Sequence, residues 1–239
     1  MLTALISGVL TFLLTFSLIP ILKKFFLIEP NKRSSHSIPK PTAGGIVFVL
    51  IISLTGILNQ HYIPLFCIPL SIVGLLDDKF DLKPNSRLIA QIVTIIFLID
   101  RLCKIYVINL YEDISNQQIF LTSFLNVYLI WNEGIAFGLL SFESLTIYNI
   151  ITFLIVLINI LIIYILFKLD DVRKYFFLII LGGSLGNLFD RFVYNAVPDF
   201  IDFHIGDFHW FIFNPADIFI TIGVFCLILV EFTSKDKKK

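Results

Sequence analysis

Long apolar runs recur along the whole chain, and they limit the possible folds more than any other feature of the sequence. Hydrophobic residues make up 57% of the 239 residues and charged residues only 15%, with a mean hydropathy of +0.91. Soluble domains have about 25% charged residues. The apolar runs are not confined to one end, which excludes a single anchor on a soluble body. The sequence therefore predicts an all-α polytopic membrane protein.

Seven apolar segments are expected to cross the membrane. They are Leu2–Leu22, Gly44–Leu58, Ile63–Leu76, Arg87–Ile108, Thr146–Phe167, Tyr175–Phe192 and Phe213–Phe232. The second and third are shorter than the roughly twenty residues that usually span a bilayer. Cations gather at residues 23–40, 79–87, 168–174 and 235–239. The positive-inside rule places these clusters in the cytoplasm and the N-terminus outside.

The segment between the fourth and fifth apolar runs, residues 109–145, is too mixed in composition to span a membrane. Within it, the stretch Phe120–Trp131 is rich in β-branched and aromatic residues, which favour strands over helix. We therefore expect a small extracytoplasmic β-sheet on the membrane surface.

Two motifs stand near the N-terminus, HSIPKPTAGG at His36–Gly45 and GLLDDKFDLKP at Gly74–Pro84. Together they resemble the polyprenyl-phosphate N-acetylhexosamine-1-phosphate transferases of glycosyltransferase family 4. This resemblance implies that Asp77 and Asp78 lie at a cytoplasmic site for magnesium and a nucleotide sugar. Adjacent carboxylates suit a hard cation that bridges phosphates.

The resemblance to the transferases ends near Gln91, and the later motifs of that family have no counterpart downstream. Residues 1–86 are therefore predicted to be a truncated fragment of such a transferase, fused to a second domain at residues 87–239. The alternative is that the acids around Asp77 belong to a solvated loop, where their negative charges balance those of Lys79 and Lys83.

Five motifs follow from the fourth apolar run onward. IDRLCK places Asp100 and Lys104 one helical turn apart, where they can pair on one face. The motif WNEGIAFG contains Asn132, and VPDFID contains Asp199. Taken alone, the Asp100–Lys104 pair also fits a structural role.

GGSLGNLFDR closes the sixth apolar run. Two of its three glycines, Gly182 and Gly186, have the small-xxx-small spacing of closely packed helices. Asn187, Asp190 and Arg191 are harder to explain by packing, because polar residues at membrane depth are costly and mark function or an internal pair. Asp190 with Arg191 is one such candidate pair.

FNPADI opens the last apolar run and reads by itself as a helix start. Asn214 suits the N-cap, Pro215 the first helical position, and Asp217 the positive end of the helix dipole. However, this acid is expected to converge on one membrane face with acids at the end of the preceding helix.

The order of these five motifs resembles the lipoprotein signal peptidases, the bacterial intramembrane aspartyl proteases known as signal peptidase II. The resemblance covers residues 87–239 and implies four of the seven spans. It assigns a catalytic dyad to Asp199 and Asp217. As substrate-binding or supporting residues it implies Asn132, Asn187, Asp190, Arg191, Asn214, Asp100 and Lys104.

The same resemblance implies the substrate and the location. The substrate is a prolipoprotein whose lipobox cysteine carries diacylglycerol, cleaved on the amino side of that cysteine. The location is the bacterial inner membrane, with membrane lipid as a partner and the site at the periplasmic face. Neither a metal, another cofactor nor a nucleic-acid partner is expected.

Hydrolysis by two carboxylates requires one ionised base and one protonated acid that share a water. Three acids, Asp190, Asp199 and Asp217, compete for these two roles. Beside Arg191, Asp190 fits a charge-compensated support. We hypothesise that the helix dipole favours ionised Asp217 and leaves Asp199 as the proton carrier.

Two other functions compete with the peptidase. One is sugar-1-phosphate transfer to undecaprenyl phosphate. The other is a membrane scaffold without catalysis, in which the acids cap helices and pair with Arg191 and Lys104.

Overall fold

The computed structural model describes residues 2–28, 37–42, 44–58, 67–80, 82, 84–113, 119–134 and 145–235. Among the residues of the motifs above, His36, Ala43, Asp81, Lys83 and residues 135–138 lie outside these ranges. The chain divides into two compact units, residues 1–91 and residues 92–239, and each is described by itself.

The first unit contains three helices, α1 (Leu2–Phe25), α2 (Gly44–Leu58) and α3 (Ile68–Phe80). Helix α1 packs against α2, and α2 packs against α3. A two-stranded antiparallel ribbon joins α1 to α2, formed by β1 (Leu27–Ile28) and β2 (Lys40–Pro41).

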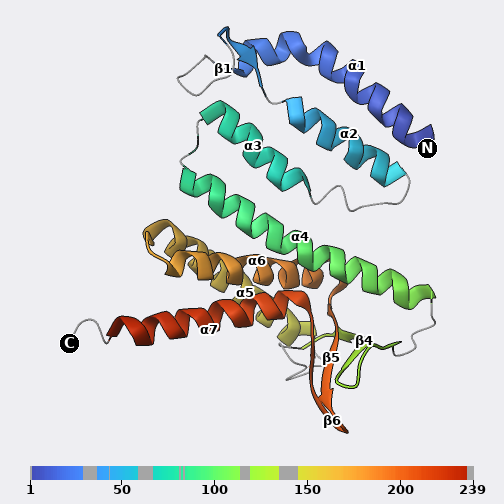
Figure 1. Cartoon of the computed structure of the whole chain (residues 1–239), viewed down its shortest axis with the longest axis vertical. Coiled ribbons are helices and arrows are strands. Elements are labelled where there is room, and N and C mark those ends of the chain that lie inside the picture. Colours follow the sequence, from blue (N-terminus) through green and yellow to red (C-terminus); the bar gives the residue numbers. More distant parts are fainter. Residues whose placement is uncertain are drawn as a thin grey trace. The chain divides into compact units, whose positions relative to one another are not determined.

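Helix α4 (Pro84–Asp113) begins in the first unit and continues into the second. The second unit adds α5 (Leu145–Lys168), α6 (Arg173–Tyr194) and α7 (Pro215–Lys235). Helix α6 packs most extensively against α7 and also against α5 (Figure 1). A Cβ atom at Gly183 would lie 2.6 Å from the carbonyl oxygen of Ala216, so α6 and α7 can approach this closely only with glycine there.

A four-stranded antiparallel sheet belongs to the second unit, in the order β3-β4-β5-β6. Its strands are β3 (Ile119–Phe120), β4 (Leu125–Asn132), β5 (Val197–Ile205) and β6 (Phe208–Phe213). The chain enters β5 at the end of α6 and leaves β6 at the start of α7 (Figure 1). The sheet therefore places β5 beside two helix ends.

The predicted sheet is present, but it is larger than the sequence indicated. Strands β3 and β4 occupy the stretch Phe120–Trp131 that was expected to form strands. Strands β5 and β6 were not predicted, because VPDFID shows no clear alternation of apolar and polar residues and the segment lies between two long apolar helices. On one side of the sheet, Val107 and Tyr111 of α4 form a small core with Phe200 of β5.

The predicted number of seven membrane spans is not confirmed. In the described residues, four helices are long and apolar enough to cross a membrane, namely Leu5–Phe25, Thr146–Lys168, Arg173–Tyr194 and Pro215–Thr233. Helix α2 is apolar but shorter, at 15 residues, and α3 has only 13. Helix α4 is long enough, but it carries several charges in its centre. The structure thus supports a mostly helical protein with several candidate membrane helices.

Candidate active site

The carboxyl groups of Asp199 and Asp217 lie on either side of one asparagine. Asp199 is on β5 and Asp217 is in the first turn of α7, and their residues are only 3% and 6% exposed. The Asn214 side chain donates from Nδ2 to Asp199 Oδ1 (2.6 Å). The backbone N–H of Asn214 donates to Asp217 Oδ2 (3.2 Å). Asn214 therefore links the two acids.

Asn214 holds this position because it also caps α7. Its Oδ1 accepts the backbone N–H of Asp217 (3.2 Å), and Pro215 occupies the first helical position. The return bond from Asp217 to the backbone of Asn214 completes a reciprocal cap. The helix start that the sequence indicated is therefore the same feature that positions one of the acids.

Two further asparagines orient the carboxylates. Asn132, at the end of β4, donates from Nδ2 to Asp199 Oδ2 (2.8 Å). Asn187 of α6 donates from Nδ2 to Asp217 Oδ1 (2.8 Å). Both oxygens of each acid thus accept a hydrogen bond, which fixes the orientation of the carboxyl planes.

Burial, together with the nearby charge of Asp217, raises the pKa of the Asp199 carboxyl to about 7. The hydrogen bonds from Asn214 and Asn132 oppose this shift, because they favour the ionised carboxylate. A carboxyl group with this pKa is partly protonated at neutral pH. Asp199 can therefore donate a proton under conditions in which an ordinary aspartate cannot.

A buried cluster of four charges lies behind the carboxylates, between α4 and α6. It comprises Asp100, Arg101, Lys104 and Asp190, each at most 1% exposed. Lys104 Nζ lies 2.9 Å from Asp100 Oδ1 and 2.7 Å from Asp190 Oδ2. The Arg101 guanidinium forms ion pairs with both acids. Two cations thus balance two anions, as the cost of burying charge requires.

This charge cluster contacts the site at two points. Lys104 Nζ donates to Asn187 Oδ1 (2.8 Å), which fixes the amide so that its Nδ2 points to Asp217. Asp100 Oδ1 accepts the backbone N–H of Ala216 at the start of α7 (3.1 Å). The cluster thereby sets the positions of both α7 and the Asn187 side chain.

The expected pairing of Asp190 with Arg191 is wrong. Asp190 pairs with Arg101 and Lys104 of α4 instead, whereas the Arg191 guanidinium lies against Gly134 and Tyr148. Arg101 was missed by the sequence analysis, although it stands beside Asp100 in the same motif. The signal was a second cation in an apolar run, which requires its own counter-ion.

Arg191 belongs to a different part of the site. Its guanidinium donates from Nη2 to the carbonyl oxygen of Gly134 and lies 5.2 Å from the ring centroid of Tyr148. Its Nε and Nη1 atoms are buried and have no hydrogen-bond partner among the described residues. Such donors are costly to bury unless a bound molecule or water satisfies them.

Two cavities adjoin the site, of which the first is lined by both acids and the second by Asp217. A cavity of about 240 Å³ is lined by polar and apolar side chains, namely Asn132, Ile155, Ser184, Asn187, Arg191, Val197, Asp199, Asn214, Asp217, Ile220 and Thr221. A second, of about 290 Å³, has a mostly apolar lining of Trp210, Phe213, Asp217, Ile218, Thr221 and Ile222. Asp217 and Thr221 line both, so polar and apolar parts of one ligand can reach the same acid.

Two buried carboxyl groups with a shared asparagine, one of them protonated near neutral pH, define an aspartic peptidase type of site. The sequence model of the signal peptidase (SPase) II family matches residues 92–233, which is more than half of the chain. The chain belongs to the signal peptidase II family, which is a family of aspartic peptidases.

Individual relatives agree with the family match. The lipoprotein signal peptidase of Pelagibacter ubique (strain HTCC1062) is 54% identical over 161 residues, which are 67% of this chain and 96% of that protein. The lipoprotein signal peptidase of Anaplasma marginale (strain Florida) is 36% identical over 150 residues, 62% of this chain and 86% of that protein. A solved structure of a bacterial membrane enzyme matches with a TM-score of 0.50 and 28% identity, covering 63% of this chain and 91% of that one.

The family match begins at Ile92, so it lies in the C-terminal part of the chain. These comparisons give no support for a transferase-like fusion in residues 1–86. They do support the peptidase and disfavour sugar-phosphate transfer as the activity of the chain.

Proposed function

We propose that this chain removes signal peptides from lipoprotein precursors, with Asp199 and Asp217 as the catalytic dyad. The observation that carries the proposal is the convergence of two buried carboxyl groups on Asn214 at the mouth of two cavities. Family membership supports the reaction type, and relatives at 54% and 36% identity are named lipoprotein signal peptidases.

In this mechanism, ionised Asp217 takes a proton from a water held between the acids, and that water attacks the scissile carbonyl. Asp199 protonates the carbonyl oxygen, which gives a gem-diol intermediate. As the C–N bond breaks, Asp217 passes its proton to the leaving amine and Asp199 takes a proton back from a gem-diol hydroxyl. The position of Asp217 at the positive end of α7 favours its ionised form. The raised pKa of Asp199 favours its protonated form. Two acids and a water suffice, so the reaction requires no metal or cofactor.

Arg191 is suited to hold the peptide backbone. Arg191 lines the 240 Å³ cavity and has two donors without a partner among the described residues, so it can donate to a substrate carbonyl oxygen. Asn132, fixed by the backbone N–H of Gly134 (2.9 Å), lies in the same lining. The mostly apolar second cavity suits a lipid chain or apolar signal-peptide residues.

The substrate that fits both cavities is a precursor with a diacylglyceryl group on the cysteine after the cleavage site. One cavity then holds the peptide and the other holds part of the lipid. Large apolar side chains of the β5–β6 hairpin, such as Ile205, Phe208 and Trp210, are exposed and suit contact with the membrane surface. We place the sheet and the site at the periplasmic face of a bacterial inner membrane.

For residues 1–86 we propose no separate activity. Asp77 of the transferase-like motif accepts hydrogen bonds from Arg87 Nη1 and the backbone N–H of Leu82, both at 3.0 Å. Asp77 lies in the last turns of α3 rather than in the predicted loop, and these contacts support a structural role for this acid at the end of the helix. The fragment keeps its sequence resemblance to transferases, which is a hypothesis about its origin.

The test is cleavage of two synthetic precursor peptides by the purified full chain in detergent. The peptides share one lipobox sequence and differ only in the diacylglyceryl group on cysteine. Mass spectrometry of the products should show cleavage of the lipid-modified peptide on the amino side of that cysteine, and little cleavage of the unmodified peptide. Equal cleavage of both peptides, or cleavage at another bond, would contradict the proposed substrate.

A further inference from the structure

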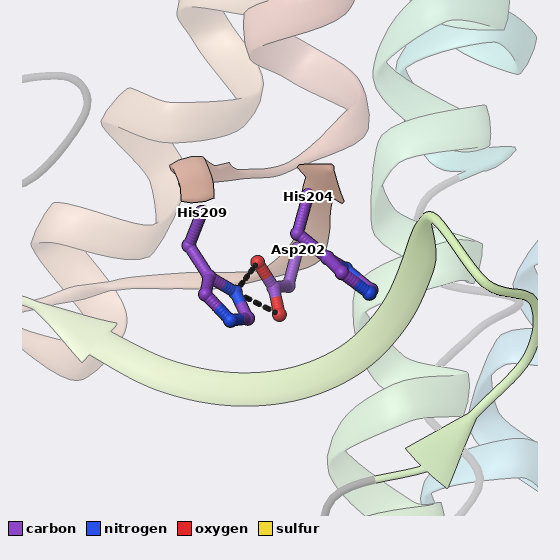
Figure 2. A group of neighbouring side chains, drawn as sticks. All are labelled: Asp202, His204 and His209. Carbon is purple, nitrogen blue, oxygen red and sulfur yellow. Dashed lines mark hydrogen bonds and ion pairs between the residues drawn. The ribbon is translucent and has the colours of Figure 1, made fainter. Parts of the chain in front are cut away.

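A second group of polar side chains lies on the four-stranded sheet, separate from the catalytic pair. It consists of Asp202 and His204 on β5 and His209 on β6, and Figure 2 shows the two rings on either side of the carboxylate. The carboxylate oxygen and the two ring nitrogens that they offer all lie within 4.8 Å of one another. These are the ligand types of zinc and related divalent ions.

The register of the sheet explains why these side chains meet. Asp202 and His204 are two residues apart on β5 and therefore share a face, and His209 is the cross-strand partner of His204. Asn126 of β4 is the cross-strand partner of Asp202. Asp199 lies three residues before Asp202, so strand alternation directs it to the other face. The group is thus separate from the catalytic pair.

A buried carboxylate lies at the centre of this group. Asp202 is only 2% exposed, and its two carboxylate oxygens lie 2.9 and 3.0 Å from His209 Nδ1. The rings of His204 and His209 are stacked with centroids 5.0 Å apart, so both imidazoles lie close to the same carboxylate. A divalent cation held between the three side chains would give the buried carboxylate a compact counter-ion.

Asn126 provides an independent indication of a ligand. Its Oδ1 atom is buried and has no hydrogen-bond partner among the described residues. Its Nδ2 atom lies 3.4 Å from both Asp202 Oδ2 and His204 Nδ1. Amide oxygen and nitrogen have nearly the same shape, so rotating the amide by about 180° turns Oδ1 toward the group. The site then has four candidate ligands from three strands.

We propose that Asp202, His204 and His209 bind one divalent transition-metal ion of the Zn²⁺ class, with Asn126 Oδ1 or water as the fourth ligand. Bonds of about 2.0–2.2 Å in a tetrahedral site put ligand atoms about 3.3–3.5 Å apart, which small side-chain rotations achieve here. The exposed side chain of His209 leaves a path for the ion. The ion would link β4, β5 and β6, and so stabilise the sheet that carries Asp199.

The experiment is calorimetric titration of Zn²⁺ into the full chain in detergent, after treatment with a chelator and desalting. Thermal unfolding with and without Zn²⁺ is the second readout, and both are independent of peptidase activity. The variants are His204→Gln and His209→Gln. The chain has two other histidines, His36 and His61, so the double variant H36Q/H61Q is the matched control.

The parent and the control should bind one Zn²⁺ per chain and show a higher Tm with the ion. Each ligand variant should lose about tenfold or more in affinity, because even residues that only orient a ligand cost 10–100-fold. Its Tm should no longer respond to Zn²⁺, while a cooperative unfolding transition without metal shows that the variant is folded. If the parent does not bind Zn²⁺, or if both ligand variants bind it as the parent does, the proposal is wrong.

Discussion

The pH dependence of cleavage should respond to loss of the hydrogen bond from Asn132 to Asp199. In the proposed mechanism Asp199 acts while protonated, so kcat/KM should fall as pH rises through the upper apparent pKa of the dyad, near 7. Asn132 donates to Asp199 Oδ2 at 2.8 Å and stabilises the ionised form. The variant Asn132→Ala removes that stabilisation, so the pKa should rise and the alkaline limb should move to higher pH.

The size of the shift follows from the strength of the bond. A hydrogen bond to a charged acceptor contributes about 1.5–3 kcal/mol, and one pKa unit corresponds to about 1.36 kcal/mol. Water or Asn214 replaces part of the lost interaction, so we expect a shift of about one unit, to near 8. Because the two acids titrate together, the measured value belongs to the pair.

The assay is the pH profile of kcat/KM with a lipid-modified fluorogenic peptide in detergent. Asn149→Ala is the matched control, because it makes the same change at an exposed asparagine of α5. The control should keep the alkaline limb near pH 7. An Asn132→Ala profile with an unchanged limb, or one moved to lower pH, would refute the assignment of Asp199 as the proton donor.

Three other substitutions test the surroundings of the dyad. Gly186→Ala places a Cβ atom 2.5 Å from Asp100 Oδ2, and thermal unfolding should show a loss of about 1–3 kcal/mol. The control Gly8→Ala, inside α1, meets no atom within 4 Å and should be neutral or slightly stabilising. Lys104→Met leaves one cation for two buried carboxylates and should reduce the free energy of unfolding by about 3–5 kcal/mol. Arg191→Met should lower kcat/KM about 10–100-fold with a smaller change in Tm, and an unchanged kcat/KM would exclude this side chain from substrate binding.

Much of the fold could be predicted because long apolar helices have a strong signal. Helix α2 has the predicted bounds, and α1, α5 and α6 differ from the prediction by a few residues at their ends. The number of spans was harder to predict, because α4 carries charges in its centre. Hydropathy alone does not reveal that these charges pair with each other and with Asp190 of α6. Strands β5 and β6 were missed because VPDFID contains no clear alternation.

In the active site too, a local feature could be predicted from the sequence, whereas contacts between different elements could not. The sequence placed Asn214, Pro215 and Asp217 at a helix start, and this local feature is present. The partners of Asp190 depend on how α6 packs on α4, so spacing along one helix could not identify Arg101. The group around Asp202 and His209 depends on a strand register across a bulge, which the sequence does not specify.

The most direct test of the account compares cleavage by the parent with cleavage by Asp199→Asn and Asp217→Asn, with a lipid-modified precursor in detergent. Asp207→Asn is the control, because this exposed residue lies in the turn between β5 and β6. The account predicts that each dyad variant loses about 100-fold or more in kcat while keeping a cooperative unfolding transition, and that the control cleaves as the parent does. Cleavage at the parent rate by either folded dyad variant would contradict it.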